Sequence, residues 1–346
     1  MTIREVLQAT GAIMVFCCTS SLAFDRGEAR FDFRVVDDAN QLVENARIRG
    51  GAWWPTDQKA LFPALAKKDF DTLTDTNGMA SVEVVAYVDV RFEVSKERHY
   101  RHNGVYQFGL PGPDEMSLAS GRWRPWPAPR AVTLKRVLNP IPMYAKRVDA
   151  PIPVLGQAVG YDLEKSDWVG SYGRGVVSDM VFCVTGTLDR VITRHGSQTV
   201  SDLNMAITFS NTGDGIQTNS VPIYNGSYVG SLLVSTHEAP VDGYHSSYDY
   251  VRRKRPKRQE CINVYNERDT QIAYFRVRTE VDEKGQVKKA WYGKMYGDLY
   301  GHYTPDGTIR VCFTYYLNPD GTRNVEFDPK RNLLTGLKTL EQVNRP

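Results

Sequence analysis

The chain has 346 residues, of which 41% are hydrophobic and 24% are charged, and its formal net charge at pH 7 is +3. These values are typical of globular proteins, so the chain can bury a core and is not a disordered tail. The charge is too small to indicate a nucleic-acid binder, in which a strongly basic face is expected. At about 150 residues per domain, the length predicts two domains.

The first 23 residues are predicted to be a signal peptide. Arg4 supplies a positive charge, an apolar stretch covers residues 11–18, and Ala23 stands at a position that a signal peptidase reads. The apolar stretch is shorter than the ~20 residues that span a bilayer. We therefore expect a secreted, periplasmic or cell-envelope protein with no transmembrane segment after cleavage. A lipid anchor on Cys17 or Cys18 is the alternative.

Cleavage after Ala23 leaves three cysteines: Cys183, Cys261 and Cys312. An odd number allows at most one intramolecular disulfide, with one thiol left over. The residues around Cys183 and Cys312 are strand-like, which favours two buried free thiols. The other interpretation is a disulfide between Cys312 and either Cys183 or Cys261.

Residues 24–138 are predicted to form a small β-sandwich. Residues 31–36 alternate apolar and other side chains, as a half-buried strand does. Asn77-Gly78 predicts a tight hairpin turn, because these residues tolerate the positive φ angles that such turns need. Residues 79–94 follow with valines in phase on one face, which is typical of strands.

Three segments in this region resemble the carboxypeptidase regulatory-like domain: FRVVDDANQLVENARI, TLTDTNGMASVEV and RHNGVYQF. The resemblance covers roughly residues 29–138 and is clearest at the hairpin motif Thr74–Gly78. Asn40-Gln41 departs from the pattern, because the family often has a glycine there. The resemblance implies a transthyretin-like or Ig-like β-sandwich that has no catalytic residues and acts as an accessory or spacer module.

Prolines at positions 140, 142, 151 and 153 predict a semi-rigid linker over residues 139–156. Residues 157–346 are predicted to form a second, larger β-rich domain. Short apolar runs alternate there with turn signals such as Pro305-Asp306-Gly307, a pattern that favours a sandwich or barrel. The segment Leu333–Val343 is the one candidate for a short helix.

Four aspartates at the start of this domain leave three interpretations open: Asp162, Asp167, Asp179 and Asp214. Aspartates favour turns. A pair of carboxylates could instead serve a glycoside hydrolase, and the Gly-rich turn at Asp214 could hold Ca²⁺. His99 and His102 lack partner ligands at zinc spacing. No motif therefore predicts a catalytic residue, a metal site or another cofactor.

Two groups of residues are candidates for ligand binding. Six cations between positions 252 and 258 predict an exposed patch for polyanions, or else a solvated loop. Aromatic residues in a Pro-rich segment could stack on a sugar ring or a protein partner, or else pack in a core. The candidate residues are Trp123, Trp126, Arg252, Arg253, Lys254, Arg255, Lys257 and Arg258.

The favoured hypothesis is a non-enzymatic envelope or secreted protein in which the second domain binds a polysaccharide or an envelope protein. No specific nucleic-acid partner is expected. The first alternative is a β-rich hydrolase that acts on envelope polysaccharide. The second is a structural surface protein that associates with itself.

Overall fold

The computed structural model describes residues 27–55, 65–87, 89–107, 117–193, 196–209, 211–220, 223–224, 227–257, 260–265, 271–297 and 299–346. The segment predicted to be a signal peptide, residues 1–23, lies outside these ranges. Within them the chain forms β-strands and two 3-10 helices of three residues each, so the predicted all-β fold class is confirmed. None of the described helices is long and apolar enough to cross a membrane.

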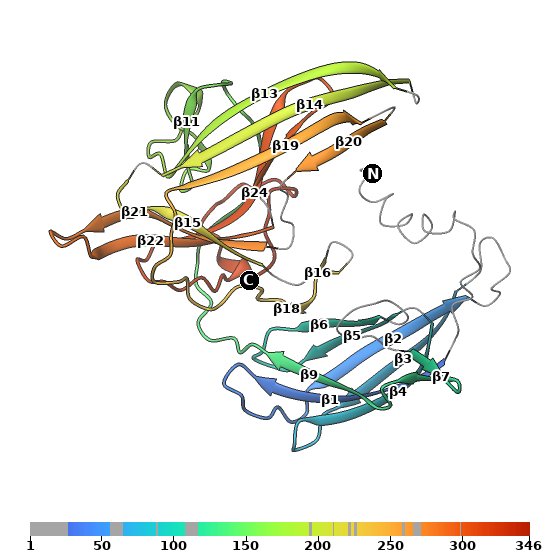
Figure 1. The fold of residues 1–346 in the computed structure, drawn as a ribbon. Helices are drawn as coiled ribbons and strands as arrows, with labels where there is room; N and C mark the ends of the chain where they lie inside the picture. The colour runs from blue at the N-terminus through green and yellow to red at the C-terminus, as the bar shows by residue number, and fades with distance from the viewer. Residues whose placement is uncertain are drawn as a thin grey trace. The chain divides into compact units, whose positions relative to one another are not determined.

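The chain folds into two compact units (Figure 1). The first comprises the described residues up to Val35, then Leu42–Glu93 and Val105–Val132. The second comprises Val36–Gln41, Val94–Gly104 and Thr133–Pro346. Three short segments that lie inside the predicted 24–138 domain, residues 36–41, 94–104 and 133–138, therefore belong to the second unit.

The first unit is built on two sheets, which Figure 1 shows as two layers. Alternate side chains of the first strand are buried, as the sequence pattern predicts. One sheet contains β1 (Gly27–Asp37), β4 (Met79–Ala86), β7 (Ser117–Ala119), β8 (Arg122–Arg124) and β9 (Ala128–Leu134). The other contains β2 (Arg47–Pro55), β3 (Leu65–Leu73), β5 (Asp89–Ser95) and β6 (His102–Gln107).

Aromatic side chains from the two sheets meet in the core of this unit. The ring of Phe31 stacks on that of Tyr106 with centroids 4.1 Å apart, and Phe33 meets Phe92 edge-on at 5.0 Å. Phe31 and Phe33 come from β1, whereas the other two rings come from the opposite sheet. This interlocking gives the unit the core of a β-sandwich.

The turn at Asn77-Gly78 does not close a hairpin, contrary to the prediction. It joins β3 to β4, which lie in different sheets. Gly78 has a φ of +67°, and the Asp75 carboxylate accepts hydrogen bonds from the backbone N–H groups of Asn77 and Met79, both at 2.8 Å. The valine-rich stretch 79–94 also divides between β4 and β5, which belong to opposite sheets. The apolar residues keep the same alternation through both strands, because both strands face the same core.

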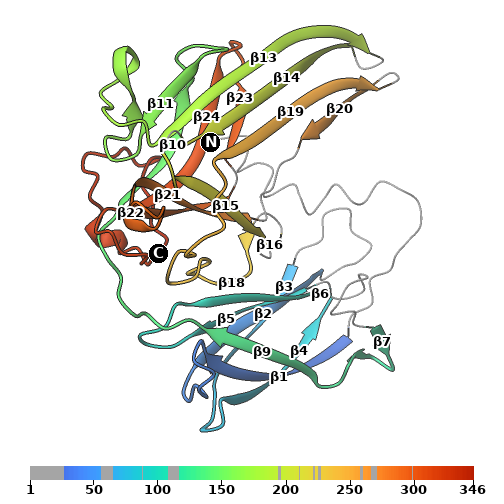
Figure 2. The ribbon, with the colours of Figure 1, turned by 60° about the vertical axis from the view of Figure 1, so that its left-hand side comes forward.

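The second unit contains two six-stranded sheets. The inner sheet runs β10-β24-β22-β21-β15, with β23 also paired to β24, and the outer sheet runs β12-β11-β13-β14-β19-β20. Figure 2 shows β13, β14 and β19 side by side in the outer sheet, and each is antiparallel to its neighbour. The bounds of the inner strands are β10 Tyr144–Pro151, β15 Gly215–Ser220, β21 Gln271–Val281, β22 Val287–Tyr296, β23 Tyr300–Tyr303 and β24 Ile309–Asn318. Those of the outer strands are β11 Ala158–Asp162, β12 Asp167–Trp168, β13 Met180–Thr193, β14 Gly196–Thr208, β19 Ser247–Lys257 and β20 Glu260–Tyr265.

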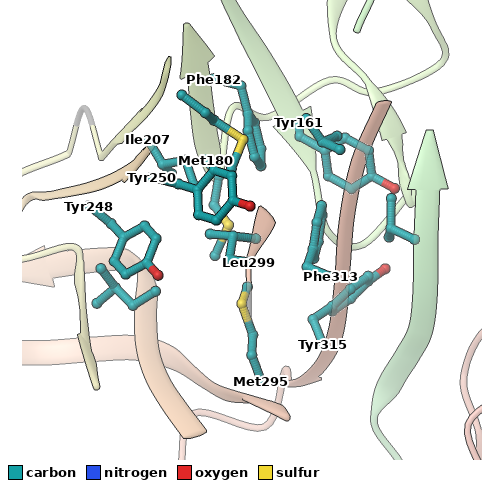
Figure 3. Close-up of a cluster of buried hydrophobic side chains, with 14 of the residues drawn as sticks. Tyr161, Met180, Phe182, Ile207, Tyr248, Tyr250, Met295, Leu299, Phe313 and Tyr315 are labelled. Atoms are coloured by element: carbon teal, nitrogen blue, oxygen red, sulfur yellow. The ribbon is translucent and has the colours of Figure 1, made fainter. Parts of the chain in front are cut away.

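The inner sheet is buried on both faces. Phe313 and Tyr315 of β24 join a cluster with Phe182 and Tyr250 of the outer sheet (Figure 3). On the opposite face, Tyr316 packs in a second cluster with residues near the C-terminus, such as Phe327. Burial on both faces explains why β24 reads as a nearly continuous apolar run rather than an alternating one.

The linker predicted over residues 139–156 is wrong for its central part, because residues 144–151 form β10. This strand pairs with β24 along its whole length, from Tyr144 opposite Leu317 to Pro151 opposite Arg310. The prolines are compatible with this strand because they lie outside it or at its last residue, where no hydrogen bond of the ladder is lost.

The helix predicted over residues 333–343 is also absent. Gly336 has a φ of +71°, and two of the segment's backbone groups bind β10 and the residue before it. The Arg147 N–H donates to the Glu341 carbonyl, and the Leu333 N–H donates to the Met143 carbonyl, both at 2.9 Å. The segment thus covers the outer edge of β10, which limits pairing of that edge with other chains.

Candidate functional site

A groove with a volume of about 410 Å³ lies beside the edge strand β10 of the second unit. We call it the β10 groove. Its walls combine aromatic rings, prolines, three carboxylates and one lysine. The lining residues are Lys146, Val148, Asp149, Ala150, Pro151, Pro153, Tyr161, Ser166, Asp167, Trp168, Tyr172 and Glu341.

The aromatic wall comes from β11, β12 and the 3-10 helix Gly170–Tyr172. Trp168 is fixed by edge-on contacts with Tyr161 at 5.1 Å and with Phe182 at 5.6 Å, and only 6% of it is exposed. Tyr172 is 45% exposed. The groove therefore offers one accessible ring, Tyr172, beside the rim of a rigid tryptophan.

The polar wall is formed by charged side chains already held in place. Asp167 accepts hydrogen bonds from the Trp168 N–H at 2.9 Å and from the Arg174 N–H at 3.1 Å. Two other lining residues form an ion pair, in which the Lys146 ammonium lies 3.2 Å from the Glu341 carboxylate. The Lys338 N–H, together with Lys146, keeps the pKa of Glu341 below its ordinary value. The polar atoms of these side chains can bind hydroxyl groups of a ligand.

Asp162 builds the loops that carry the groove. One carboxylate oxygen accepts the N–H groups of Glu164 and Lys165 at 2.9 and 3.0 Å, and the other accepts those of Val176 and Val177 at 2.9 and 3.0 Å. Burial opposes ionisation of Asp162, but the N–H groups of Val177, Lys165 and Val176 and the charge of Arg278 outweigh it and lower the pKa of Asp162. Asp162 therefore has the turn-forming role that was one of the sequence interpretations.

Arg278 neutralises the carboxylates behind these loops. Its guanidinium lies 2.8 Å from Asp179, 2.6 Å from Glu164 and 3.2 Å from Asp162, and it stacks over the Trp291 ring at 4.2 Å. Burial raises the pKa of Asp179, although the contact with Arg278 acts in the opposite direction. Asp162 and Asp179 are 1% and 2% exposed, so they do not face a cleft as a hydrolytic carboxylate pair would.

Asp214, the candidate calcium ligand, has a similar structural environment. Its two carboxylate oxygens accept the N–H groups of Thr279 and Arg278 at 2.9 and 3.0 Å, and Asn211 lies 3.4 Å away. The residue is 8% exposed. A calcium ion would have to displace these donors, because both oxygens are already engaged.

The two candidate tryptophans differ in their placement. Trp123 lies in β8, is 4% exposed, and donates its indole N–H to the Ala86 carbonyl at 3.2 Å. The burial of Trp123 follows the core-packing interpretation. Trp126 is half-buried, and the Arg122 guanidinium lies 4.8 Å from its ring. Both tryptophans belong to the first unit.

The basic run 252–258 lies in the second unit and is mostly strand rather than loop. Arg252, Arg253, Lys254, Arg255 and Lys257 all lie in β19. Arg253 pairs with Asp202 at 3.1 Å, and Arg255 pairs with the same carboxylate. Strand alternation places Arg252 and Lys254 on the opposite face. The charge is thus divided between two faces and partly neutralised. The side chain of Lys257 and the whole of Arg258 lie outside the described residues.

One group in the described part of the chain could hold a metal ion: Asp149, His302 and Cys312. No motif in the sequence predicted this group. A local signal existed, because the turn at Pro305–Gly307 folds β23 back on β24 and brings His302 near Cys312. Asp149 carries no such signal, since it reaches the group only through the pairing of β10 with β24. Cys183 and Cys312 are free thiols, so the Cys183–Cys312 disulfide is absent.

Comparison with known proteins leaves the family open. No protein-family model matches the chain, and no curated protein matches its sequence. A chlorocatechol 1,2-dioxygenase from Pseudomonas putida has 15% identity and a TM-score of 0.23, with 34% of this chain and 64% of that one covered, which is under two thirds of the dioxygenase. A streptococcal ancillary pilin has 8% identity and a TM-score of 0.18, with 91% of this chain and 64% of the pilin covered. The shaft pilin SpaA of Lactobacillus rhamnosus GG has 9% identity and a TM-score of 0.18, with 56% of this chain and 90% of the pilin covered. Similarity this low assigns neither family nor activity.

Proposed function

We propose that this chain is an exported, non-enzymatic binding protein whose second unit takes a saccharide in the β10 groove. The observation that carries the proposal is the pairing of an accessible ring, Tyr172, with the fixed polar groups Lys146, Asp167 and Glu341 in one groove. A sugar ring presents an apolar face that packs on an aromatic side chain and a rim of hydroxyl groups that need hydrogen-bond partners.

A binding role is favoured over hydrolysis by the state of the carboxylates. A glycosidase needs one carboxyl group as an acid and a second as a base or nucleophile on either side of the scissile bond. Asp162 and Asp179 are instead bound to Arg278 and to backbone N–H groups. Asp167 lines the groove, but it is held by the Trp168 and Arg174 N–H groups.

The proposal assigns the first unit a supporting role. Its two facing sheets and its aromatic core are compatible with the carboxypeptidase regulatory-like resemblance of residues 29–138. That family resemblance implies a spacer or accessory module. The first unit is then a spacer, and the second unit binds the ligand.

The test is a binding measurement with the purified chain from residue 24 onward, against polysaccharides extracted from the envelope and medium of the source cell. We expect Tyr172→Ala to weaken retention by about tenfold, equivalent to about 1.4 kcal/mol. Trp126→Ala is the matched control, because it removes a half-buried ring in the first unit. Loss of binding in Trp126→Ala but not in Tyr172→Ala would place the site elsewhere.

The same mixtures should be assayed for new reducing ends. Retention without release supports a binding protein. Release of sugar fragments by the unaltered chain would overturn the non-enzymatic assignment. Asp167→Asn would then be the first variant to assay, because Asp167 is the one of the four candidate aspartates that lines the groove.

A further inference from the structure

Three side chains with metal-binding atoms lie together on adjacent strands of the inner sheet in the second unit. Asp149 of β10 is directly opposite Cys312 of β24, and β23 flanks β24 on its other side with His302 opposite Arg310. Cys312 lies between Val311 and Phe313, which face the outer sheet. Strand alternation therefore turns Cys312 to the other face, away from the shared core.

The separations of the three groups match those of ligands around one ion. The Cys312 Sγ lies 3.4 Å from Asp149 Oδ1 and 3.6 Å from His302 Nδ1, and all three ligand atoms lie within 4.8 Å of one another. Tetrahedral zinc binds sulfur at about 2.3 Å and nitrogen or oxygen at about 2.0–2.1 Å, which places sulfur about 3.5 Å from the other ligands. An ion could therefore enter with little movement of the strands.

The same distances also fit a thiol that is hydrogen-bonded to a carboxylate and an imidazole. Burial and the nearby Asp149 carboxylate raise the pKa of Cys312 to about 12. A metal ion changes the balance, because it displaces the thiol proton and binds the thiolate directly.

The surroundings make the site accessible but not strongly attractive to cations. The side chain of Asp149 is 55% exposed, so an ion has a path from solvent. Arg310 holds the Asp149 carboxylate at 2.6 Å and orients it, as outer-shell partners of metal ligands do. The positive charge of Arg310, and that of Arg252 near His302, opposes binding of a dication. We therefore expect moderate affinity.

We propose that Asp149, His302 and Cys312 bind one transition-metal dication of the zinc type, with a fourth coordination position open to water or to an external ligand. One sulfur, one nitrogen and one oxygen donor select Zn²⁺ or Co²⁺ over Ca²⁺ and Mg²⁺, which prefer oxygen donors alone. The inference goes beyond saccharide binding. His302 and Cys312 are not among the residues that line the β10 groove, whereas Asp149 is.

The experiment is titration of the full purified chain, reduced and freed of metal, with Co²⁺ and then with competing Zn²⁺. We expect one equivalent of Co²⁺ to bind with a thiolate charge-transfer absorption and the intense visible bands of a tetrahedral site. Cys312→Ser should abolish the thiolate band, and His302→Gln should weaken affinity about tenfold or more. Cys183→Ser is the matched control, because it removes the other described free thiol.

Two results would overturn the site. One is a thiolate band that persists in Cys312→Ser, and the other is the absence of saturable Co²⁺ binding to the unaltered chain. If Cys312→Ser does not fold, His302→Gln and Asp149→Asn decide the question, because both side chains are at least partly exposed. Saccharide retention measured on His302→Gln separates the two proposals, since that variant should lose metal and keep sugar.

Discussion

Replacing Arg278 with methionine removes the guanidinium that joins Asp162, Glu164 and Asp179 behind the β10 groove. Arg278 has a φ of +56°, in the left-handed region that arginine rarely adopts, at a point where the pairing of β21 with β22 shifts register. The contacts with three carboxylates explain why an arginine stands at a position where a glycine would be less strained.

The expected loss of stability follows from burial. The Asp162 and Asp179 side chains are 1% and 0% exposed, and that of Arg278 is 19% exposed. Removing one partner of a buried ion pair leaves an uncompensated charge and typically costs about 3–5 kcal/mol. Arg174→Met is the control, because Arg174 also pairs with an aspartate but is 89% exposed, and such pairs contribute at most about 1 kcal/mol.

The assay is urea unfolding combined with native-state amide exchange. The Leu163 N–H, bound to Asp179, and the Val177 N–H, bound to Asp162, should lose protection first in Arg278→Met. In the double variant with Asp179→Asn the loss should be smaller than the sum of the single losses, because one buried charge is gone. A destabilisation by Arg278→Met below about 1 kcal/mol would refute this reasoning.

Three further outcomes are expected. Contacts with Glu326 and Asp38 raise the pKa of His237 above 6.5, and hydrogen bonds lower that of Glu326 from 4.5 to about 2 despite burial. The stability that His237 contributes is therefore complete below pH 6.5 and is lost as the pH rises through its folded pKa. The stability that Glu326 contributes is complete above pH 4.5 and is lost as the pH falls towards 2. Urea unfolding midpoints of the unaltered chain and of His237→Gln, measured across both pH ranges, check the two dependences. Trp123→Ala should cost about 3–5 kcal/mol in urea unfolding because the ring is 4% exposed, while Trp126→Ala should cost less than about 1 kcal/mol, and equal losses would contradict the structure. Lys294 is fully buried and burial lowers its pKa, so Lys294→Met should leave the melting temperature unchanged or raise it, and a marked fall would show that the amine stabilises the fold.

Local patterns in the sequence were sufficient to predict the secondary-structure class. The alternation at residues 31–36 became the buried-and-exposed pattern of β1. The turn predicted at Pro305–Gly307 is also present, since the Gly307 N–H donates to the Thr304 carbonyl at 3.0 Å. Such features depend on residues that are close in sequence, so they can be predicted without knowledge of the remaining chain.

The tertiary structure decided which strands are neighbours. The prolines around β10 indicated a linker, yet its pairing with β24 makes residues 144–151 part of the inner sheet. The run 79–94 looked like one strand and is two strands in opposite sheets. Sequence periodicity shows which side chains are buried, but it does not show which sheet buries them.

The candidate sites depend on the same long-range pairing. Asp149, His302 and Cys312 meet because β10 and β23 both flank β24, and Arg278 reaches Asp162 and Asp179 across about a hundred residues of chain. Tryptophan is a residue type that often binds ligands, but Trp123 is buried and does not lie at the surface. The sequence alone determined the class of fold and the turns because these arise from neighbouring residues, whereas the sites required the register between strands that only the folded sheet defines.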